Sequence, residues 1–175
     1  MLLHTFQQLP GIRERTERRM WESGVVDWSG AGPHRPNRID PQEYEEAIGG
    51  SRLAWERADA AWFGRRLPSK ERWRIYNDFH AHAAYLDIET TGAARGVDAI
   101  TCVAVATKGG VRTYVKDRNL ERFPESIRDA SIVVTFNGGA FDLPFLRDAF
   151  GEGPSRRTPT STYVWHCGGS DGAAA

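Results

Sequence analysis

The sequence predicts an α/β protein in which an N-terminal helical region precedes a mixed sheet. Three observations lead to this prediction. Aromatic and aliphatic residues recur at near-helical spacing before residue 82, and short apolar runs bounded by turn residues dominate after it. Those runs first follow one another directly and then alternate with helical stretches, which is typical of a mixed sheet.

Length and composition limit the class of protein. The 175 residues allow one ordinary domain and a small accessory one. A hydrophobic content of 40% with 11% aromatics indicates a packed chain rather than a disordered one. The 23 basic and 23 acidic residues cancel, so any nucleic-acid partner must be held by local features rather than by overall charge.

No targeting or membrane segment is expected. The start, MLLHTFQQLPGIRER, lacks the basic and long apolar regions of a signal peptide. No apolar run approaches the roughly 18 residues that a membrane span needs, and Cys102 and Cys167 form neither a disulfide framework nor a zinc site. We therefore expect a cytoplasmic protein without a membrane partner, and the sequence leaves the oligomeric state open.

Residues 1–30 are expected to form a helical hairpin, with a turn at LPGI and a helix over residues 13–23 that Gly24 terminates. Residues 31–82 are expected to hold a linker and three helices. Asp40 followed by Pro41 predicts an N-cap, and that helix is expected to end at Gly49-Gly50. The other two are predicted over residues 51–64 and 69–79.

Residues 83–150 are expected to form one α/β domain. The predicted strands are 85–88, 99–106, 111–115 and 131–136, and the predicted helices are 120–130 and 141–150. Residues 151–175 contain no Leu, Ile, Phe or Met, so we expect them to be disordered and to supply no core element.

Two acidic residues, Asp87 and Glu89, end the first apolar run, just before Thr90-Thr91-Gly92. In a strand, residues two apart point to the same face, so these carboxylates would lie side by side, with Cα atoms roughly 6–7 Å apart. A divalent cation between them allows both to stay ionised, and oxygen ligands suit Mg²⁺ or Mn²⁺. The alternative is a strand end whose polar residues simply enter solvent.

A second acidic position lies in TFNGGAFDLPFL, residues 135–146, where Asp142 falls in the first turn of a predicted helix. One interpretation is a carboxylate that favours the positive end of the helix dipole. The other is a third metal ligand, with Gly138 and Gly139 allowing a nucleic-acid strand to approach the backbone.

The two motifs together, D-x-E-T-T-G and F-N-G-x-x-F-D-x-P-F-L, resemble the first two motifs of the DEDD-type 3′–5′ exonucleases, which share the ribonuclease H-like fold. The phrases LPGI, TERRMWESGVVDW, LPSKERWRIY and YLDIETTG are similar to those of a bacterial ribonuclease H-like family of predicted exonucleases (YprB-type, DnaQ-like superfamily). This resemblance covers about residues 6–150.

The resemblance implies a 3′–5′ exonuclease acting on DNA or RNA with two Mg²⁺ or Mn²⁺ ions. It implies Asp87, Glu89 and Asp142 as the catalytic metal ligands. Substrate-binding roles would fall to four residues: Thr90, Thr91, Asn137 and Phe141. Phe141 could stack on a base or pack in the core.

The N-terminal hairpin resembles a helix-hairpin-helix, a module that binds DNA phosphates at a helix start. Four arginines could assist such binding: Arg13, Arg15, Arg18 and Arg19. Only Gly11 of the two usual turn glycines is present, with Arg13 at the second place, so a purely structural cap is the alternative.

The resemblance also implies a fourth carboxylate and a His or Tyr base, for which residues 151–175 offer no place. Read from the third base of each codon, TPTSTYVWHCGGSDG can back-translate to a phrase similar to the family's continuation. We therefore expect a truncated domain, with a shifted reading frame near residues 152–158, an uncovered sheet face and impaired turnover. The alternatives are a non-catalytic nucleic-acid-binding module and an inactive fragment.

Overall fold

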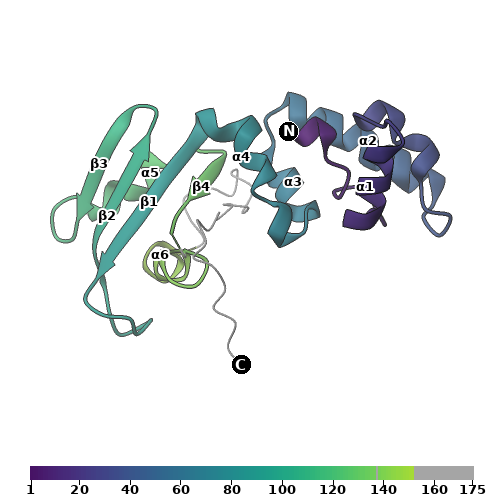
Figure 1. Cartoon of the computed structure of the whole chain (residues 1–175). Helices are drawn as coiled ribbons and strands as arrows, with labels where there is room; N and C mark the ends of the chain where they lie inside the picture. The colour runs from purple at the N-terminus through teal and green to yellow at the C-terminus, as the bar shows by residue number, and fades with distance from the viewer. Residues whose placement is uncertain (137, 152–175) are drawn as a thin grey trace. The chain divides into compact units, whose positions relative to one another are not determined.

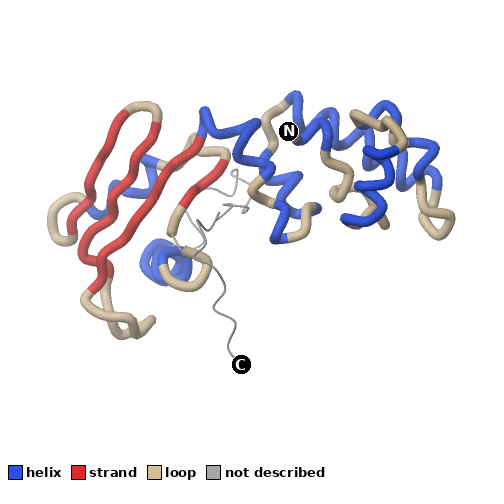
Figure 2. The backbone as a smooth tube through the Cα atoms, viewed as in Figure 1, coloured by secondary structure: helices blue, strands red, loops and turns tan. Residues whose placement is uncertain are grey.

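The computed structural model describes residues 1–136 and 138–151. The expectations for Asn137 and for residues 152–175, including the shifted reading frame, lie outside the described residues. The chain divides into two compact units, Met1–Ala81 and a second one that begins at His82 (Figure 1). Strands lie in the second unit, while the first unit consists of helices and loops (Figure 2). Within the described ranges, no helix is long and apolar enough to cross a membrane.

The first unit contains four α-helices: α1 (Glu14–Glu22), α2 (Pro41–Glu56), α3 (Ala60–Arg66) and α4 (Arg74–Phe79). Trp28, which lies in a short 3-10 turn, stacks on Phe63 of α3 with ring centroids 6.0 Å apart. A fully buried carboxylate, Glu17 of α1, accepts hydrogen bonds from the Phe6 backbone N–H at 2.7 Å and from Arg74 at 2.9 Å. A buried charge is tolerated only when it is paired in this way.

The predicted N-terminal hairpin is only half present. Its second arm, α1, matches the predicted helix, and Gly24 after it has the expected left-handed φ of 84°. Its first arm is a single 3-10 turn, Leu2–His4, followed by the turn at Gly11 with φ 73°. Leu2 and Phe6 are fully buried, so tertiary packing holds the segment without a helix.

The prediction that a helix ends at Gly49-Gly50 is wrong, because α2 continues through both residues to Glu56. Neither glycine has a positive φ. A Cβ on Gly50 would lie 2.9 Å from the Trp62 ring, so the glycine allows α3 to approach α2 closely. The break comes instead at Ala58, with φ 53°, and Asp59 then caps α3 by accepting a hydrogen bond from the Trp62 backbone N–H at 2.9 Å.

Two other predictions about the first unit have clear outcomes. The predicted N-cap at Asp40 is confirmed, since its carboxylate accepts hydrogen bonds from the backbone N–H groups of Gln42 at 2.8 Å and Glu43 at 3.1 Å. The predicted helix over residues 69–79 is divided into a 3-10 turn, Ser69–Glu71, and α4.

The second unit is built on a four-stranded sheet in the order β3-β2-β1-β4. Its strands are β1 (Ala83–Thr90), β2 (Ile100–Thr107), β3 (Gly110–Val115) and β4 (Ile132–Val134). Strand β2 pairs antiparallel with both β1 and β3, and β4 pairs parallel with β1. The predicted mixed α/β sheet is confirmed.

One face of this sheet carries the core of the second unit. Leu86 and Ile88 of β1 alternate with exposed residues, and they pack with Val103 of β2. Helix α5 (Phe123–Ser126) adds Phe123 and helix α6 (Asp142–Phe150) adds Phe145 to the same cluster. The helix predicted over residues 120–130 is therefore much shorter than expected. Its place is taken by a 3-10 turn, Leu120–Arg122, and the four residues of α5.

Candidate functional site

The candidate site lies where β1 extends past its parallel neighbour. The last pair between the two strands joins Tyr85 to Val134, and β1 continues to Thr90. Asp87 and Glu89 lie in this extension, and both are exposed while Leu86 and Ile88 are buried. The alternation therefore places both carboxylates on the face of β1 opposite the core, as the spacing predicts.

A bulge follows directly after these acids. Glu89 pairs with Cys102 of β2, but Thr90 pairs with Ile100, so Thr101 is the additional residue. The Thr101 hydroxyl donates a hydrogen bond to the Glu89 carbonyl at 3.1 Å. Bulges bend a strand and change the direction of its side chains, and no sequence pattern marks this one.

Asp142 reaches the same end of β1 from the other motif. It is the first residue of α6, and its side chain is 3% exposed. Burial raises the pKa of the Asp142 carboxyl, and the negative charge of Asp87 adds to this rise. Hydrogen bonds from the backbone N–H groups of Asp142 itself and of Ile88 act in the opposite direction. The structure thus brings Asp142 within electrostatic reach of Asp87.

The described carboxylates do not by themselves form a closed metal cage. In residues 1–136 and 138–151, no group of three or more His, Cys, Asp and Glu side chains could hold a metal ion. Asp87 and Asp142 are nevertheless two neighbouring acids, one of them buried, and a cation between them would relieve their repulsion. This donor set suits a hard, oxygen-binding divalent ion.

The threonines predicted to contact substrate have structural partners. The Thr90 hydroxyl donates to the Gly92 carbonyl at 2.6 Å, and the Thr91 hydroxyl donates to Asp98 at 2.9 Å. A Cβ on Gly92 would lie 2.6 Å from the Asp98 carboxylate. The glycine of the first motif is therefore required by the loop that follows β1.

The turn of the second motif also has a structural reason for its glycine. A Cβ on Gly138 would overlap the Thr135 side chain, whose hydroxyl is buried and has no hydrogen-bond partner among the described residues. Phe141 is half-buried against the core, with its ring centroid 4.9 Å from that of Phe145. Asn137 lies outside the described residues.

The two motifs are linked by an ion pair. Arg95, in the loop after β1, donates two hydrogen bonds to Asp148 of α6, at 2.9 Å and 2.8 Å. The pair is exposed, with 53% and 42% of the two side chains accessible. Because α6 begins with Asp142, this pair helps to set the position of the second motif relative to the first.

One aromatic residue near the site was missed by the sequence reasoning. Phe136 lies two residues after Val134, the end of β4, and is 72% exposed. The sequence places it at the end of the strand predicted over residues 131–136, and the structure ends that strand at Val134. An exposed aromatic ring can stack on a nucleic-acid base.

A match to a family model supports the fold. Residues 84–165 match a family model described as the RNase_H superfamily. The structure of the family B DNA polymerase from the hyperthermophilic archaeon Pyrobaculum calidifontis is similar at 25% identity, with a TM-score of 0.32. That match covers 38% of this chain and 10% of the polymerase chain, and no curated protein matches the sequence. The second unit, with its mixed α/β sheet, therefore contains most of the segment that is similar to the RNase_H superfamily.

Proposed function

We propose that this protein is a metal-dependent nuclease that removes nucleotides from the 3′ end of a nucleic-acid strand. The observation that carries the proposal is the approach of buried Asp142 to Asp87 at the exposed end of β1. Both residues lie within the segment 84–165 that matches the model of the RNase_H superfamily. Because the charge of Asp87 disfavours ionised Asp142, a cation near both acids would be attracted to this strand end.

Asp87 and Asp142 would hold the divalent ion, Mg²⁺ or Mn²⁺, and Glu89 is placed on the same face of β1 as Asp87. The ion would supply an activated water and charge stabilisation of the phosphate. Burial of Asp142 keeps one ligand out of solvent, which strengthens its attraction to a cation. Exposed Phe136 would support a base near the strand end.

Roles in substrate binding for Thr90, Thr91, Asn137 and Phe141 remain part of the proposal. The partners of both threonine hydroxyls favour contact through the backbone of their loop rather than through the side chains. The packing of Phe141 on Phe145 favours a supporting position beneath the turn.

A second function is a nucleic-acid-binding module without catalysis. It is favoured by the lack, in the part of the chain that the structure describes, of a group of three metal-ligating side chains. For the same reason we expect the turnover of the nuclease to be weak.

The test uses the full chain with DNA and RNA oligonucleotides that carry a label at the 5′ end, in Mg²⁺ or Mn²⁺. Stepwise shortening from the 3′ end is expected. Asp87→Ala should lower the rate by about 10²-fold or more, as loss of a preorganised charged group does. Asp129→Ala, which removes an exposed acid elsewhere in the unit, is the control. Binding without shortening would select the second function, and metal-independent cleavage would contradict the first.

A further inference from the structure

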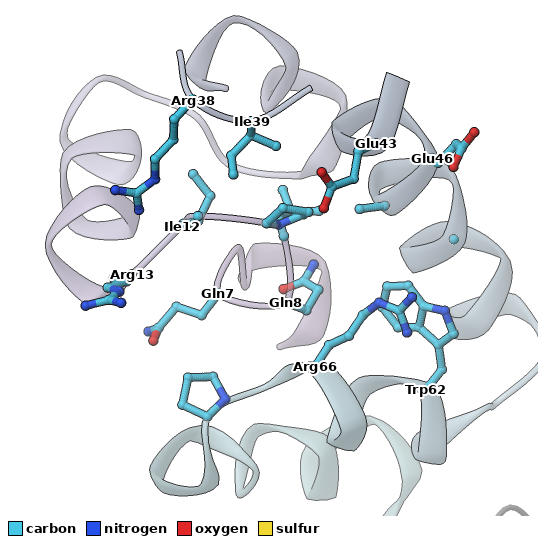
Figure 3. A pocket seen from close by; sticks show the side chains of 16 residues that line it. Gln7, Gln8, Ile12, Arg13, Arg38, Ile39, Glu43, Glu46, Trp62 and Arg66 are labelled. Atoms are coloured by element: carbon cyan, nitrogen blue, oxygen red, sulfur yellow. The ribbon is translucent and has the colours of Figure 1, made fainter. Parts of the chain in front are cut away.

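Strand β3 lies at the outer edge of the sheet. It stands at the end of the order β3-β2-β1-β4, so within the described residues it has a neighbouring strand on one side only (Figure 1). An open edge presents unpaired N–H and C=O groups, to which an extended segment of another chain can add. The first unit has no such edge in its described elements, and its surface carries instead a cavity of about 910 Å³ whose lining includes Arg13, Arg38 and Trp62 (Figure 3).

The side chain of Asn119 lies against the outer edge of β3. Its Oδ1 accepts a hydrogen bond from the Val115 backbone N–H at 2.7 Å, and its Nδ2 donates to the Thr113 carbonyl at 3.3 Å. The next residue, Lys116, donates its backbone N–H to Thr101 beside β3, at 2.9 Å. Because successive residues of a strand direct their backbone groups to opposite sides, those of Thr113 and Val115 point away from β2.

These two hydrogen bonds follow the pattern of a parallel strand. In a parallel pair, one residue donates to a carbonyl of the partner strand and accepts from the N–H two residues further along. A side-chain amide carries the same donor and acceptor groups as a peptide. The Asn119 amide uses both, on either side of Tyr114, and therefore takes the place of a strand residue opposite Tyr114.

The backbone after β3 turns so as to return Asn119 to this edge. Asp117 adopts the left-handed region with φ 60°, and the Val115 carbonyl accepts from the backbone N–H groups of Arg118 at 3.2 Å and Asn119 at 3.1 Å. Asn119 is also the N-cap residue of the 3-10 turn Leu120–Arg122, but its side chain makes no capping hydrogen bond there. An N-cap asparagine ordinarily accepts from its own helix, so this amide is directed to the strand instead.

The part of the edge that Asn119 leaves open is short. By the same alternation, the outward groups still available on β3 are the Thr113 N–H and the two backbone groups of Val111. Val111 is β-branched and 74% exposed, which would favour strand pairing if the whole edge were free. Short edges resist the addition of another strand, and β4, at the other end of the order, has only the three residues Ile132–Val134.

We propose that Asn119 is an edge-blocking residue, whose side-chain amide occupies the outer edge of β3 and keeps the sheet from pairing with β3 of a second copy of this chain. A second copy is the occupant because its own β3, freed in the same way, has the same length and alternation, and two identical edges can pair antiparallel about a two-fold axis. The proposal uses none of the residues of the proposed nuclease site, and it stands or falls separately from it.

Sedimentation velocity of the full chain over a range of concentrations tests the association. Asn119→Ala should add a species of twice the wild-type mass as the concentration rises. Asn37→Ala, which alters an exposed asparagine of the first unit, is the control and should add none. Lack of the added species in Asn119→Ala, or its presence in both variants, would overturn the proposal.

A second substitution locates the association at β3. Thr113→Pro in the Asn119→Ala background should abolish the added species. The Thr113 N–H points away from β2, so proline breaks no bond within the sheet but denies a donor to an incoming strand. Association that survives this substitution would overturn the assignment to the β3 edge.

Amide hydrogen exchange by NMR, at a concentration where the variants are monomeric, tests the contact itself. In Asn119→Ala the Val115 N–H should exchange about tenfold faster than in the wild type, because it loses its acceptor. The Tyr114 N–H, which faces β2, should keep its wild-type rate. Asn119→Asp retains an acceptor and should keep the Val115 N–H protected. Equal acceleration at Val115 and Tyr114, or at Val115 in both variants, would show general loosening and overturn the proposal.

Discussion

At the scale of single residues, Asp142 shows how a candidate catalytic group costs stability. Its carboxyl is buried and lies within electrostatic reach of Asp87, so its pKa in the folded protein is raised above the ordinary value of 3.8. A raised folded pKa means that the folded state holds the proton more tightly than the unfolded chain does. The contribution of this group to stability is therefore fully present below pH 3.8 and is lost as the pH rises through the folded pKa.

Asp142→Asn should consequently stabilise the protein at neutral pH in EDTA. The amide can still accept the hydrogen bond from the backbone, but it carries no charge to be buried or to repel Asp87. The gain in the free energy of unfolding over the wild type should be absent near pH 3 and grow towards pH 7. Urea unfolding at both pH values measures it, with Asp129→Asn as the exposed control. A gain that is equal at the two pH values would contradict the explanation.

At the scale of secondary-structure elements, α2 shows how two adjacent glycines can have different roles. Both lie inside the helix, but nothing lies within 4 Å of a Cβ placed on Gly49, while one placed on Gly50 would lie 2.9 Å from Trp62. Glycine inside a helix costs roughly 0.5–1 kcal/mol relative to alanine. Gly49 therefore destabilises the helix without any packing contact that requires it. Gly50 destabilises the helix too, but its lack of a side chain makes room for the Trp62 ring.

Gly49→Ala should raise the free energy of unfolding by about 0.5–1 kcal/mol. Gly50→Ala should give no such gain and should change the fluorescence of Trp62, because the ring must move. The two variants are matched in chemistry, helix and position, so thermal unfolding of both tests the contact directly. Equal stabilisation by both would show that Trp62 yields at no cost.

The same elements show what the sequence reveals. The helix start at Asp40, the turn at Gly24 and the alternation of buried and exposed residues in β1 follow from local rules of capping, turn conformation and strand geometry. The continuation of α2 through two glycines could not be predicted, because its cause is the Trp62 ring of another helix. Local rules could not predict that Asp142 lies near Asp87, because this proximity depends on strand pairing across some fifty residues. It could be expected only from the resemblance of the two motifs to a known family.

At the scale of the whole molecule, charge balance limits how nucleic acid can be held. The 23 basic and 23 acidic residues leave no net charge, so long-range attraction to a strand is weak and binding must come from a few contacts. For single strands, the logarithm of the affinity falls by about 0.7 per phosphate contact for each tenfold rise in salt. Two such contacts would correspond to a slope of about −1.4.

Fluorescence anisotropy with a labelled oligothymidylate should show this shallow dependence, roughly a sevenfold loss of affinity between 50 and 200 mM salt. A slope near −4 would indicate a broad basic surface and would contradict binding through a few contacts.

Because Thr135 and Gly138 lie so close together, substitutions at these two positions can be accepted only in one order. Any side chain at position 138 would overlap the Thr135 side chain, so a substitution there is acceptable only in a chain whose residue 135 has already become smaller. Thr135→Gly can be followed by Gly138→Ala without overlap. In the reverse order, the single variant Gly138→Ala would displace the turn that precedes Asp142. Related chains with a side chain at position 138 should therefore also have a smaller residue at position 135, whereas a change at position 135 alone is allowed.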